Sequence, residues 1–329
     1  MKYSLGFLLI LLILKLTTGF NQKQTPPDPN IVLIFLDDMG NGDLGSTGAL
    51  DYTTPILDKF GNEGIRFTNF LTAQAVCSAS RAALLTGCYP NRIGFSGALF
   101  PNSSIGINSS ELTLPELVKQ KGYVTGMVGK WHLGDSKEFL PLQHGFDEYF
   151  GLPYSNDMWP IDFAGQPAGD WRKDRFPPLY ILEGNDRQIP VATLADKANL
   201  TKQYTQRAVD FINRNKAKPF FLYFAHSMPH VPINASEQFK GKSKQGLYGD
   251  VMMEIDWSVG EVLNALQKNG LDNNTLIIFT SDNGPWLNFG NHAGSTGGLR
   301  EGKGNSFEGG MRVPCLMRWK GTLPEALIS

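Results

Sequence analysis

The stretch Asn30-Ile-Val-Leu-Ile-Phe-Leu-Asp37 decides the fold class, because six consecutive apolar residues lead directly into a carboxylate. The run is short, rich in β-branched residues, and shows no alternation of apolar and polar positions. A strand of this kind is buried on both faces, as in a parallel sheet that helices cover. The run therefore predicts a central strand that ends in the acidic pair Asp37-Asp38.

Three further apolar runs repeat this pattern, at residues 125–131, 219–226 and 275–282. Helical patterns lie between the runs, at residues 55–64, 114–122, 201–215 and about 249–269. Helices that alternate with short buried strands are typical of the α/β class. We therefore expect an α/β fold built on a parallel sheet.

The composition limits the class of protein further. The chain has 329 residues, of which 41% are hydrophobic and 19% charged, as in ordinary globular proteins. The formal net charge of -1 predicts no nucleic-acid partner. The three cysteines, Cys77, Cys88 and Cys315, exclude a disulfide scaffold but leave a Cys77–Cys88 pair open.

The N-terminus has the pattern of a secretory signal peptide over residues 1–19. A positive start precedes the apolar residues 5–14, and residues 17–19 (Thr-Thr-Gly) offer small side chains for cleavage. A membrane anchor is the alternative, although Lys15 interrupts the apolar run and leaves it short. Five Asn-x-Ser/Thr glycosylation sequons also fit a secreted protein, at Asn102, Asn108, Asn199, Asn234 and Asn273.

Polar side chains follow all four apolar runs. In chain order they are Asp37, Asp38, Lys130, His132, His226, His230, Asp282 and Asn283. Ligands bind outside the carboxyl ends of parallel strands, so we expect these residues to share one site. Carboxylate and amide oxygens suit Ca²⁺ or Mg²⁺ better than zinc, and a lysine beside a histidine suits an anionic ester. The alternatives are structural: a turn at residues 282–285, a solvated lysine, or a packed histidine.

Two further stretches carry groups suited to such a site. Residues 75–87 (AVCSASRAALLTG) place Cys77 at the start of a predicted helix, where the helix dipole stabilises negative charge. Residues 294–310 are rich in glycine and contain Lys303, and glycines permit close approach of a ligand to the backbone. The second stretch does not match a Walker phosphate loop. The alternative interpretation is a surface loop that binds no ligand.

Two long motifs carry a family resemblance. Residues 77–87 (CSASRAALLTG) and 122–134 (GYVTGMVGKWHLG) resemble the two signatures of the sulfatases, within the alkaline phosphatase superfamily. The similarity runs from about residue 30 to the C-terminus. The sequence resembles most the arylsulfatase and N-acetylgalactosamine-6-sulfatase branch of the family, because of the motif PYSNDM at residues 153–158.

The resemblance implies a fold and a nucleophile. The fold is an alkaline-phosphatase-like α/β domain over residues 20–329, with a large mixed, mostly parallel sheet flanked by helices on both faces. Cys77 is expected to be oxidised to Cα-formylglycine by the formylglycine-generating enzyme of the endoplasmic reticulum. Its hydrated aldehyde would attack a sulfate monoester and pass through a covalent sulfo-enzyme intermediate.

The resemblance also implies a metal site and two residues that assist the nucleophile. Ca²⁺, in preference to Mg²⁺, would be bound by Asp37, Asp38, residue 77, Asp282 and Asn283. The ion would favour an alkoxide nucleophile and polarise the sulfate. Arg81 would orient the nucleophile, and His132 would accept the proton whose loss drives the release of sulfate.

Substrate ligands follow from the same resemblance. They are Lys130, Ser155, His230 and Lys303, with His230 or Lys303 protonating the leaving alcohol. His226 has no secure family counterpart, and we expect it to support the site from behind.

The sequence departs from the family pattern in two places. Position 79 is Ala, where eukaryotic members usually have Pro, which bears on how efficiently Cys77 is modified. The chain also ends at Ser329, and the smaller C-terminal antiparallel subdomain of the family is expected to be missing. Its loss would expose apolar surface and remove part of the substrate pocket.

The expected partners are a sulfated small molecule, glycolipid or glycan as substrate, and the formylglycine-generating enzyme; a homodimer is open. The expected location is the secretory pathway, ending in the lysosome or outside the cell.

Two alternatives remain for the function. One is a phosphomonoester or phosphodiester hydrolase of the same superfamily, against which Cys77 argues because those enzymes use Ser or Thr. The other is an inactive secreted binding protein.

Overall fold

The computed structural model describes residues 28–329, and the predicted signal peptide lies outside the described residues. β1 (Asn30–Leu36) is a central strand, as its apolar run predicts. It pairs in parallel with β7 (Phe220–Ala225) and with β8 (Thr275–Ser281), and β7 pairs in parallel with β3 (Val124–Gly129). The four strands predicted from sequence are thus confirmed as adjacent parallel strands, in the order β8-β1-β7-β3.

The complete sheet has ten strands in the order β10-β2-β9-β8-β1-β7-β3-β4-β5-β6. The remaining strands are β2 (Ile65–Phe67), β4 (Glu148–Gly151), β5 (Leu179–Glu183), β6 (Asp186–Val191), β9 (Cys315–Arg318) and β10 (Leu327–Ile328). β4 continues the parallel centre, whereas β5, β6 and β9 pair antiparallel with their neighbours. The expected mixed, mostly parallel sheet is therefore confirmed.

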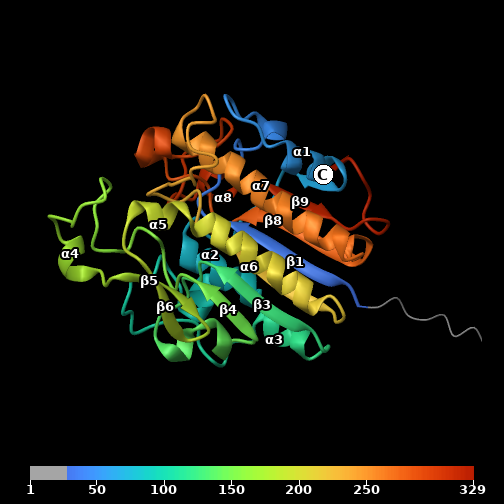
Figure 1. The fold of residues 1–329 in the computed structure, drawn as a ribbon, viewed down its shortest axis with the longest axis horizontal. Coiled ribbons are helices and arrows are strands. Elements are labelled where there is room, and N and C mark those ends of the chain that lie inside the picture. Colours follow the sequence, from blue (N-terminus) through green and yellow to red (C-terminus); the bar gives the residue numbers. More distant parts are fainter. Residues whose placement is uncertain (1–27) are drawn as a thin grey trace, which may run out of the picture.

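Helices cover both faces of the sheet (Figure 1). In chain order they are α1 (Pro55–Asn62), α2 (Cys77–Thr86), α3 (Leu114–Lys119), α4 (Arg172–Arg175), α5 (Leu194–Ala198), α6 (Leu200–Asn215), α7 (Leu247–Lys268) and α8 (Glu308–Met311). α1, α6 and α7 pack on one face, and α2 and α3 pack on the other. No helix among residues 28–329 has both the length and the hydropathy to span a membrane.

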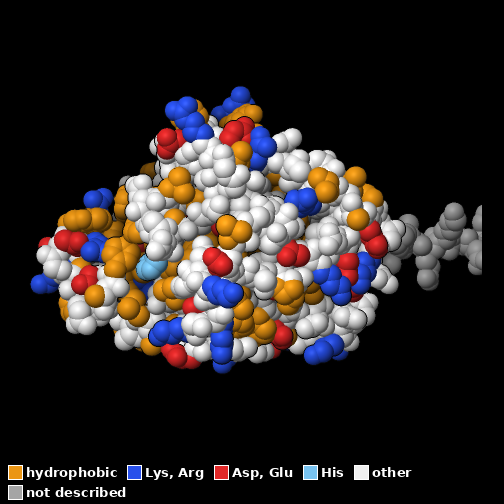
Figure 2. Space-filling model, turned by 90° about the horizontal axis from the view of Figure 1, so that it is seen from above, with side chains coloured by type: hydrophobic (Ala, Val, Ile, Leu, Met, Phe, Trp, Pro, Cys, Tyr) orange, Lys and Arg blue, Asp and Glu red, His pale blue; other side chains and the backbone are white. Residues whose placement is uncertain are grey.

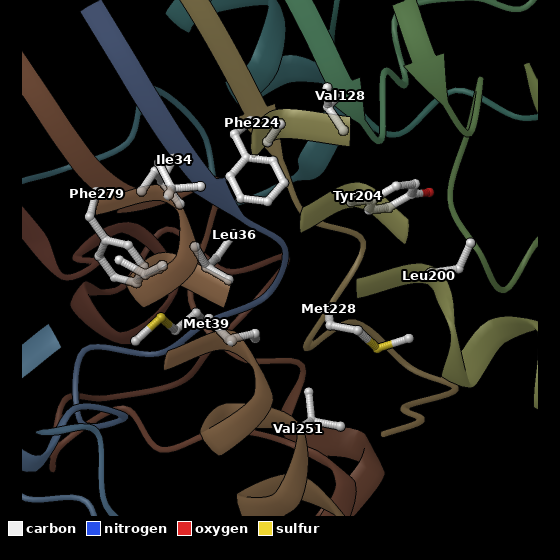
Figure 3. Close-up of a cluster of buried hydrophobic side chains, with 14 of the residues drawn as sticks. Ile34, Leu36, Met39, Val128, Leu200, Tyr204, Phe224, Met228, Val251 and Phe279 are labelled. Carbon is white, nitrogen blue, oxygen red and sulfur yellow. The ribbon is translucent and has the colours of Figure 1, made fainter. Parts of the chain in front are cut away.

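The central strand supplies core to both layers because successive side chains point to opposite faces. Ile34 and Leu36 lie in the layer with α6 and α7, and Figure 3 shows them beside Phe224 and Phe279. Phe35 faces the layer that contains α2. Each such side chain contributes about 1.5–3 kcal/mol when fully buried. Burial on both faces therefore fixes the direction and register of β1, and with them the place where Asp37 emerges.

His226 follows β7 but packs into the helical layer. Its ring centroid lies 4.2 Å from that of Phe224, and its Nε2 lies 3.4 Å from the Ser258 hydroxyl of α7. Its Nδ1 has no hydrogen-bond partner. Burial lowers the pKa of His226 to about 3, so the imidazole is neutral in the folded protein.

We predict that His226 makes the fold sensitive to acid. Its folded pKa lies below the unfolded value of about 6.5, so the unfolded state binds the proton first. The free energy of unfolding should then fall as the pH drops below about 6.5, by up to about 1.4 kcal/mol per pH unit. Urea unfolding of wild type and His226→Gln at pH 7 and pH 5 measures this. The wild type should lose about 2 kcal/mol more than the variant; an equal loss would contradict a neutral buried imidazole.

Candidate active site

The predicted polar residues converge at the carboxyl ends of the parallel strands. Asp37 and Asp38 follow β1, Lys130 follows β3, and Asp282 follows β8. Each of these side chains is buried, with 4% or less of its surface exposed. The sheet topology predicts this meeting point, because all four central strands run in the same direction.

Cys77 is the first residue of α2 and lies among the carboxylates. Its Sγ is 3.5 Å from Asp37 Oδ1 and 4.0 Å from Asp38 Oδ1. Burial raises the pKa of the thiol, and the nearby lysines offset only part of that rise. Cys77 and Cys88 are both free, so the open disulfide pair is absent from the structure. An unmodified Cys77 is therefore a neutral thiol, which is a poor nucleophile.

Arg81 lies one helical turn after Cys77 and on the same face of α2. Its Nε and Nη2 donate to Asp282 Oδ2 at 3.1 and 2.8 Å. Its Nη1 donates to the carbonyl of Lys130 at 2.9 Å. Arg81 thereby ties α2 to the ends of β8 and β3 and sets the position of residue 77.

Two lysines approach the acidic pair from different segments. Lys130 Nζ lies 2.5 Å from Asp37 Oδ2 and donates to Ser155 Oγ at 3.2 Å. Lys303 Nζ lies 2.7 Å from Asp38 Oδ1. Burial lowers the pKa of Lys303, but Asp38 and the neighbouring acidic groups raise it further, so the pKa lies well above its ordinary value. Ion pairs with the acidic pair therefore hold both lysine side chains in place, and Lys303 stays positively charged.

The charges in this group are balanced. Three carboxylates face three cations. The carboxylates belong to Asp37, Asp38 and Asp282, and the cations belong to Arg81, Lys130 and Lys303. Burial raises the pKa of Asp37, but Lys130 and the other nearby cations lower it more, and the net shift is downward. A divalent cation added to a balanced group leaves it net positive, which suits an anionic ester.

His132 presents an unpaired base. Its Nε2 donates to the Leu99 carbonyl at 2.9 Å, because a carbonyl can only accept. The Nδ1 atom is then unprotonated, and it is buried without a partner. Burial and the nearby Lys130 hold the pKa of His132 well below 6.5. His132 is therefore neutral and able to accept a proton at Nδ1.

His230 stands between Ser155 and the acidic pair. Its Nδ1 donates to the Val231 carbonyl at 2.5 Å. Its Nε2 lies 3.6 Å from Asp38 Oδ2 and 3.4 Å from Ser155 Oγ. Nε2 is thus the ring atom that faces the site.

The oxygen atoms among the possible ligands fit a hard cation. Ligand atoms of Asp37, Asp38, Cys77 and His230 lie within 4.8 Å of one another. Asn283 donates its amide to Asp38 Oδ1 at 2.7 Å, while its own Oδ1 is buried without a partner. An unpaired buried oxygen beside two carboxylates is the chemistry that Ca²⁺ prefers.

One predicted ligand is held differently from the others. Asp282 Oδ2 accepts from Arg81, and Asp282 Oδ1 accepts from the Asp38 backbone N–H at 3.1 Å. Asp282 lies outside the compact group of ligand atoms, whereas His230, predicted as a sulfate ligand, lies inside it. The sequence cannot distinguish these positions, because both residues simply follow parallel strands.

Trp286 is a site neighbour that the sequence analysis did not single out. Its ring centroid lies 5.7 Å from that of His230, and Lys303 Nζ lies 4.7 Å from it. Phe289 packs against its other side at 4.8 Å. Trp286 is half-buried, so it forms a wall at the edge of the buried group. Its place shortly after Asp282-Asn283 is the only sequence signal for this role.

Four of the five glycosylation sequons have an exposed asparagine. Asn102, Asn108, Asn199 and Asn273 are exposed, whereas Asn234 is half-buried and donates to the Pro232 carbonyl at 3.2 Å. Figure 2 shows one face of the molecule, on which acidic and basic side chains are interspersed. Hydrophobic side chains gather there toward the end that carries α4.

Known proteins with a similar sequence are sulfatases. N-acetylgalactosamine-6-sulfatase of Canis lupus familiaris is 42% identical over 334 residues, which cover 97% of this chain and 62% of that protein. Arylsulfatase A of Homo sapiens is 40% identical over 326 residues, which cover 94% of this chain and 62% of that protein. The chain thus spans less than two thirds of the length of these relatives.

Solved structures agree. The PsFucS1 sulfatase from Pseudoalteromonas sp. has a TM-score of 0.84 and 30% identity, over 92% of this chain and 64% of that one. The phosphonate monoester hydrolase of Agrobacterium radiobacter, at 19% identity and a TM-score of 0.57, shares the fold alone. The sequence model of the family described as Sulfatase matches residues 29–329, nearly all of the described chain. The chain therefore belongs to the sulfatase family.

Proposed function

We propose that this protein hydrolyses sulfate monoesters at the buried group around Cys77. The observation that carries the proposal is the position of Cys77, at the first turn of α2 and within 4.0 Å of two carboxylates. A neutral buried thiol has no evident use there, whereas the signature around it is that of a modified nucleophile. Family membership and the fixed charges of Lys130 and Lys303 support the same reading.

Two groups would complete this site. Oxidised to formylglycine, residue 77 would supply a hydrated aldehyde as the nucleophile. Ca²⁺ would be bound by oxygens of Asp37, Asp38 and Asn283 together with residue 77. Asp282, whose carboxylate also accepts from Arg81, would be a further ligand. The ion would stabilise negative charge on the attacking oxygen and on the sulfate.

The chain's own residues would then have separate tasks. Arg81 holds residue 77 in place through Asp282, and Lys130 and Lys303 bind sulfate oxygens as fixed cations. Electrostatic stabilisation of this kind depends on charges that are in place before the substrate arrives. The ion pairs hold these side chains in one arrangement, so little reorganisation is needed.

Proton transfer falls to the two histidines. The unpaired Nδ1 of neutral His132 suits the acceptance of a proton during release of sulfate. Lys303 is a poor acid, because its pKa is raised well above the ordinary value. His230, whose Nε2 faces the site beside Ser155, is placed to donate to the leaving alcohol when its ring is protonated.

The biological setting is proposed by analogy. The substrate would be a sulfated small molecule, glycolipid or glycan, and the name N-acetylgalactosamine-6-sulfatase of one matched relative favours the glycan. Modification of Cys77 requires passage through the endoplasmic reticulum and the formylglycine-generating enzyme. A lysosomal or extracellular location would follow from that route.

Conversion of Cys77 is the first prediction from this function. Protein produced in a eukaryotic secretory pathway should show, by mass spectrometry of the peptide around residue 77, the mass of formylglycine in place of cysteine. It should hydrolyse 4-nitrophenyl sulfate much faster than 4-nitrophenyl phosphate. Cys77→Ser should abolish turnover, because serine lacks the second hydroxyl that expels sulfate. Unmodified cysteine together with an inactive wild type would refute the proposal.

His132 should control the acid side of the pH profile. Because its pKa lies well below 6.5, the base remains unprotonated as the pH falls through 6.5, and kcat should hold over that range. His132→Gln should lower kcat by about 10²–10⁴-fold. Measurement of kcat from pH 4 to pH 8 tests both statements. A wild-type acid limb centred at pH 6.5 or above would count against a depressed pKa at His132.

Trp286 should act mainly on substrate binding. Aromatic contacts of this kind contribute about 0.5–1.5 kcal/mol, so Trp286→Ala should raise the KM for 4-nitrophenyl sulfate up to about tenfold. Trp286→Phe should recover most of the loss. The matched control is Trp257→Ala on α7, where the indole packs against Phe239. If the alanine substitutions at positions 286 and 257 change the KM equally, Trp286 does not line the substrate-binding site.

A further inference from the structure

Asp43 is a buried carboxylate that the proposed chemistry does not use. It lies five residues after Asp38, with 1% of its surface exposed, and burial raises its pKa to about 6. Its Oδ2 accepts from the Gly40 N–H and the Tyr248 hydroxyl, both at 2.7 Å. Its Oδ1 accepts from the Ser295 N–H at 2.7 Å and lies 3.4 Å from the Tyr52 hydroxyl. Both oxygens are thus fully engaged.

These contacts join two loops that carry site residues. The first loop, residues 37–44, contains Asp38, and the second loop, residues 293–304, contains Lys303. The Gly42 N–H donates to the Ser295 carbonyl at 2.9 Å, so the bond from Ser295 to Asp43 is one of a reciprocal pair. At the far end of the second loop, the Lys303 N–H donates to the Pro285 carbonyl at 2.9 Å. The second loop is therefore fastened at both ends.

Glycines allow the two loops to approach this closely. A Cβ atom on Gly40 would lie 2.1 Å from the Ser295 carbonyl oxygen, and one on Gly42 would lie 2.6 Å from the Gly297 nitrogen. A Cβ atom on Gly294 would lie 2.1 Å from Asp43 Oδ2. No other residue fits at Gly40 or Gly42 without moving a backbone, and none fits at Gly294 without displacing the buried Asp43 side chain. The geometry around Asp43 is accordingly a tight junction and not an incidental contact.

We propose that Asp43 is a positioning residue that clamps the first loop to the second and so fixes Lys303 Nζ against Asp38. The clamp acts through Lys303 and makes no contact with the reacting atoms. Its effect on catalysis rests on the sulfate ester hydrolysis proposed above. A displacement of about 1 Å at a positioned group can cost on the order of 10²-fold in rate, so a junction of this kind matters to turnover.

Asp43→Asn is the informative substitution. Each carboxylate oxygen accepts one backbone N–H, from Gly40 or from Ser295. An asparagine amide must therefore place its NH₂ against one of these N–H groups, whichever way it is turned. The variant keeps the size of the side chain and removes one of these two bonds, either the bond to Ser295 that joins the loops or the bond to Gly40 that shapes the first loop.

The chain provides a matched control in Asp256 of α7. Its Oδ1 accepts from the Leu57 N–H at 2.8 Å, and its Oδ2 accepts from the Ile56 N–H at 3.2 Å. It is 4% exposed, and burial raises its pKa to about 6 as well. Asp256→Asn thus breaks the same kind of bond at the start of α1, where no site residue is involved.

The experiment compares these two variants with the wild type in the full chain. We measure Tm, the kcat and KM for 4-nitrophenyl sulfate, and the Kd of inorganic sulfate by calorimetry. Both variants should lower Tm by similar amounts. Asp43→Asn should also lower kcat at least tenfold and weaken sulfate binding severalfold, while Asp256→Asn should stay within about twofold of the wild type in kcat and Kd.

The outcomes separate the clamp from the proposed function. Equal kcat and sulfate Kd in the two variants would make Asp43 a structural residue only and overturn the clamp. A wild type that does not hydrolyse the ester contradicts the proposed function, while sulfate binding still decides on the clamp. If Asp43→Asn does not fold, Tyr248→Phe is the second variant, because it removes one hydrogen bond to Asp43. It should lower kcat and weaken sulfate binding by smaller amounts. Unchanged kcat and sulfate Kd in this variant would overturn the clamp.

Discussion

Lys130 pairs with Asp37, Arg81 with Asp282, and Lys303 with Asp38, in a place where none of these six side chains is more than 10% exposed. Charges can be buried in this way only when each has a partner, because an unpaired one costs about 3–5 kcal/mol. The partners come from five separate segments of the chain. The pairing therefore requires the ends of β1, β3 and β8, the start of α2, and the second loop to arrive together.

The same requirement connects the fold to the chemistry. A parallel sheet places its strand ends at one edge, and helices on both faces exclude water from the strands themselves. The charged side chains are buried for this reason, and electrostatic interactions between them are strong. Asn283 Oδ1 and His132 Nδ1 are buried without a hydrogen-bond partner. They are the atoms that remain available for a cation and a proton.

Much of this arrangement could be predicted from the sequence, but not all of it. The four central strands were predictable because burial on both faces leaves an uninterrupted apolar run, as in Ile31 to Leu36. The antiparallel strands β5, β6 and β9 were not, because no apolar run of that length marks them. The meeting of Asp37 with Lys130 follows from strand direction. The contact of Trp286 with His230 depends on how two loops fold back, and no periodicity records that.

The sequence by itself determined the fold class, the strand ends that carry the site, and the family, because these depend on local hydrophobic pattern and on two contiguous motifs. Tertiary structure alone decided the rest. Tyr248 donates to Asp43 across 205 positions of the chain, and His230 joins the compact ligand group while Asp282 is held by Arg81. Such choices arise when buried polar atoms must all find partners in one packed arrangement, and that condition acts on the whole chain at once.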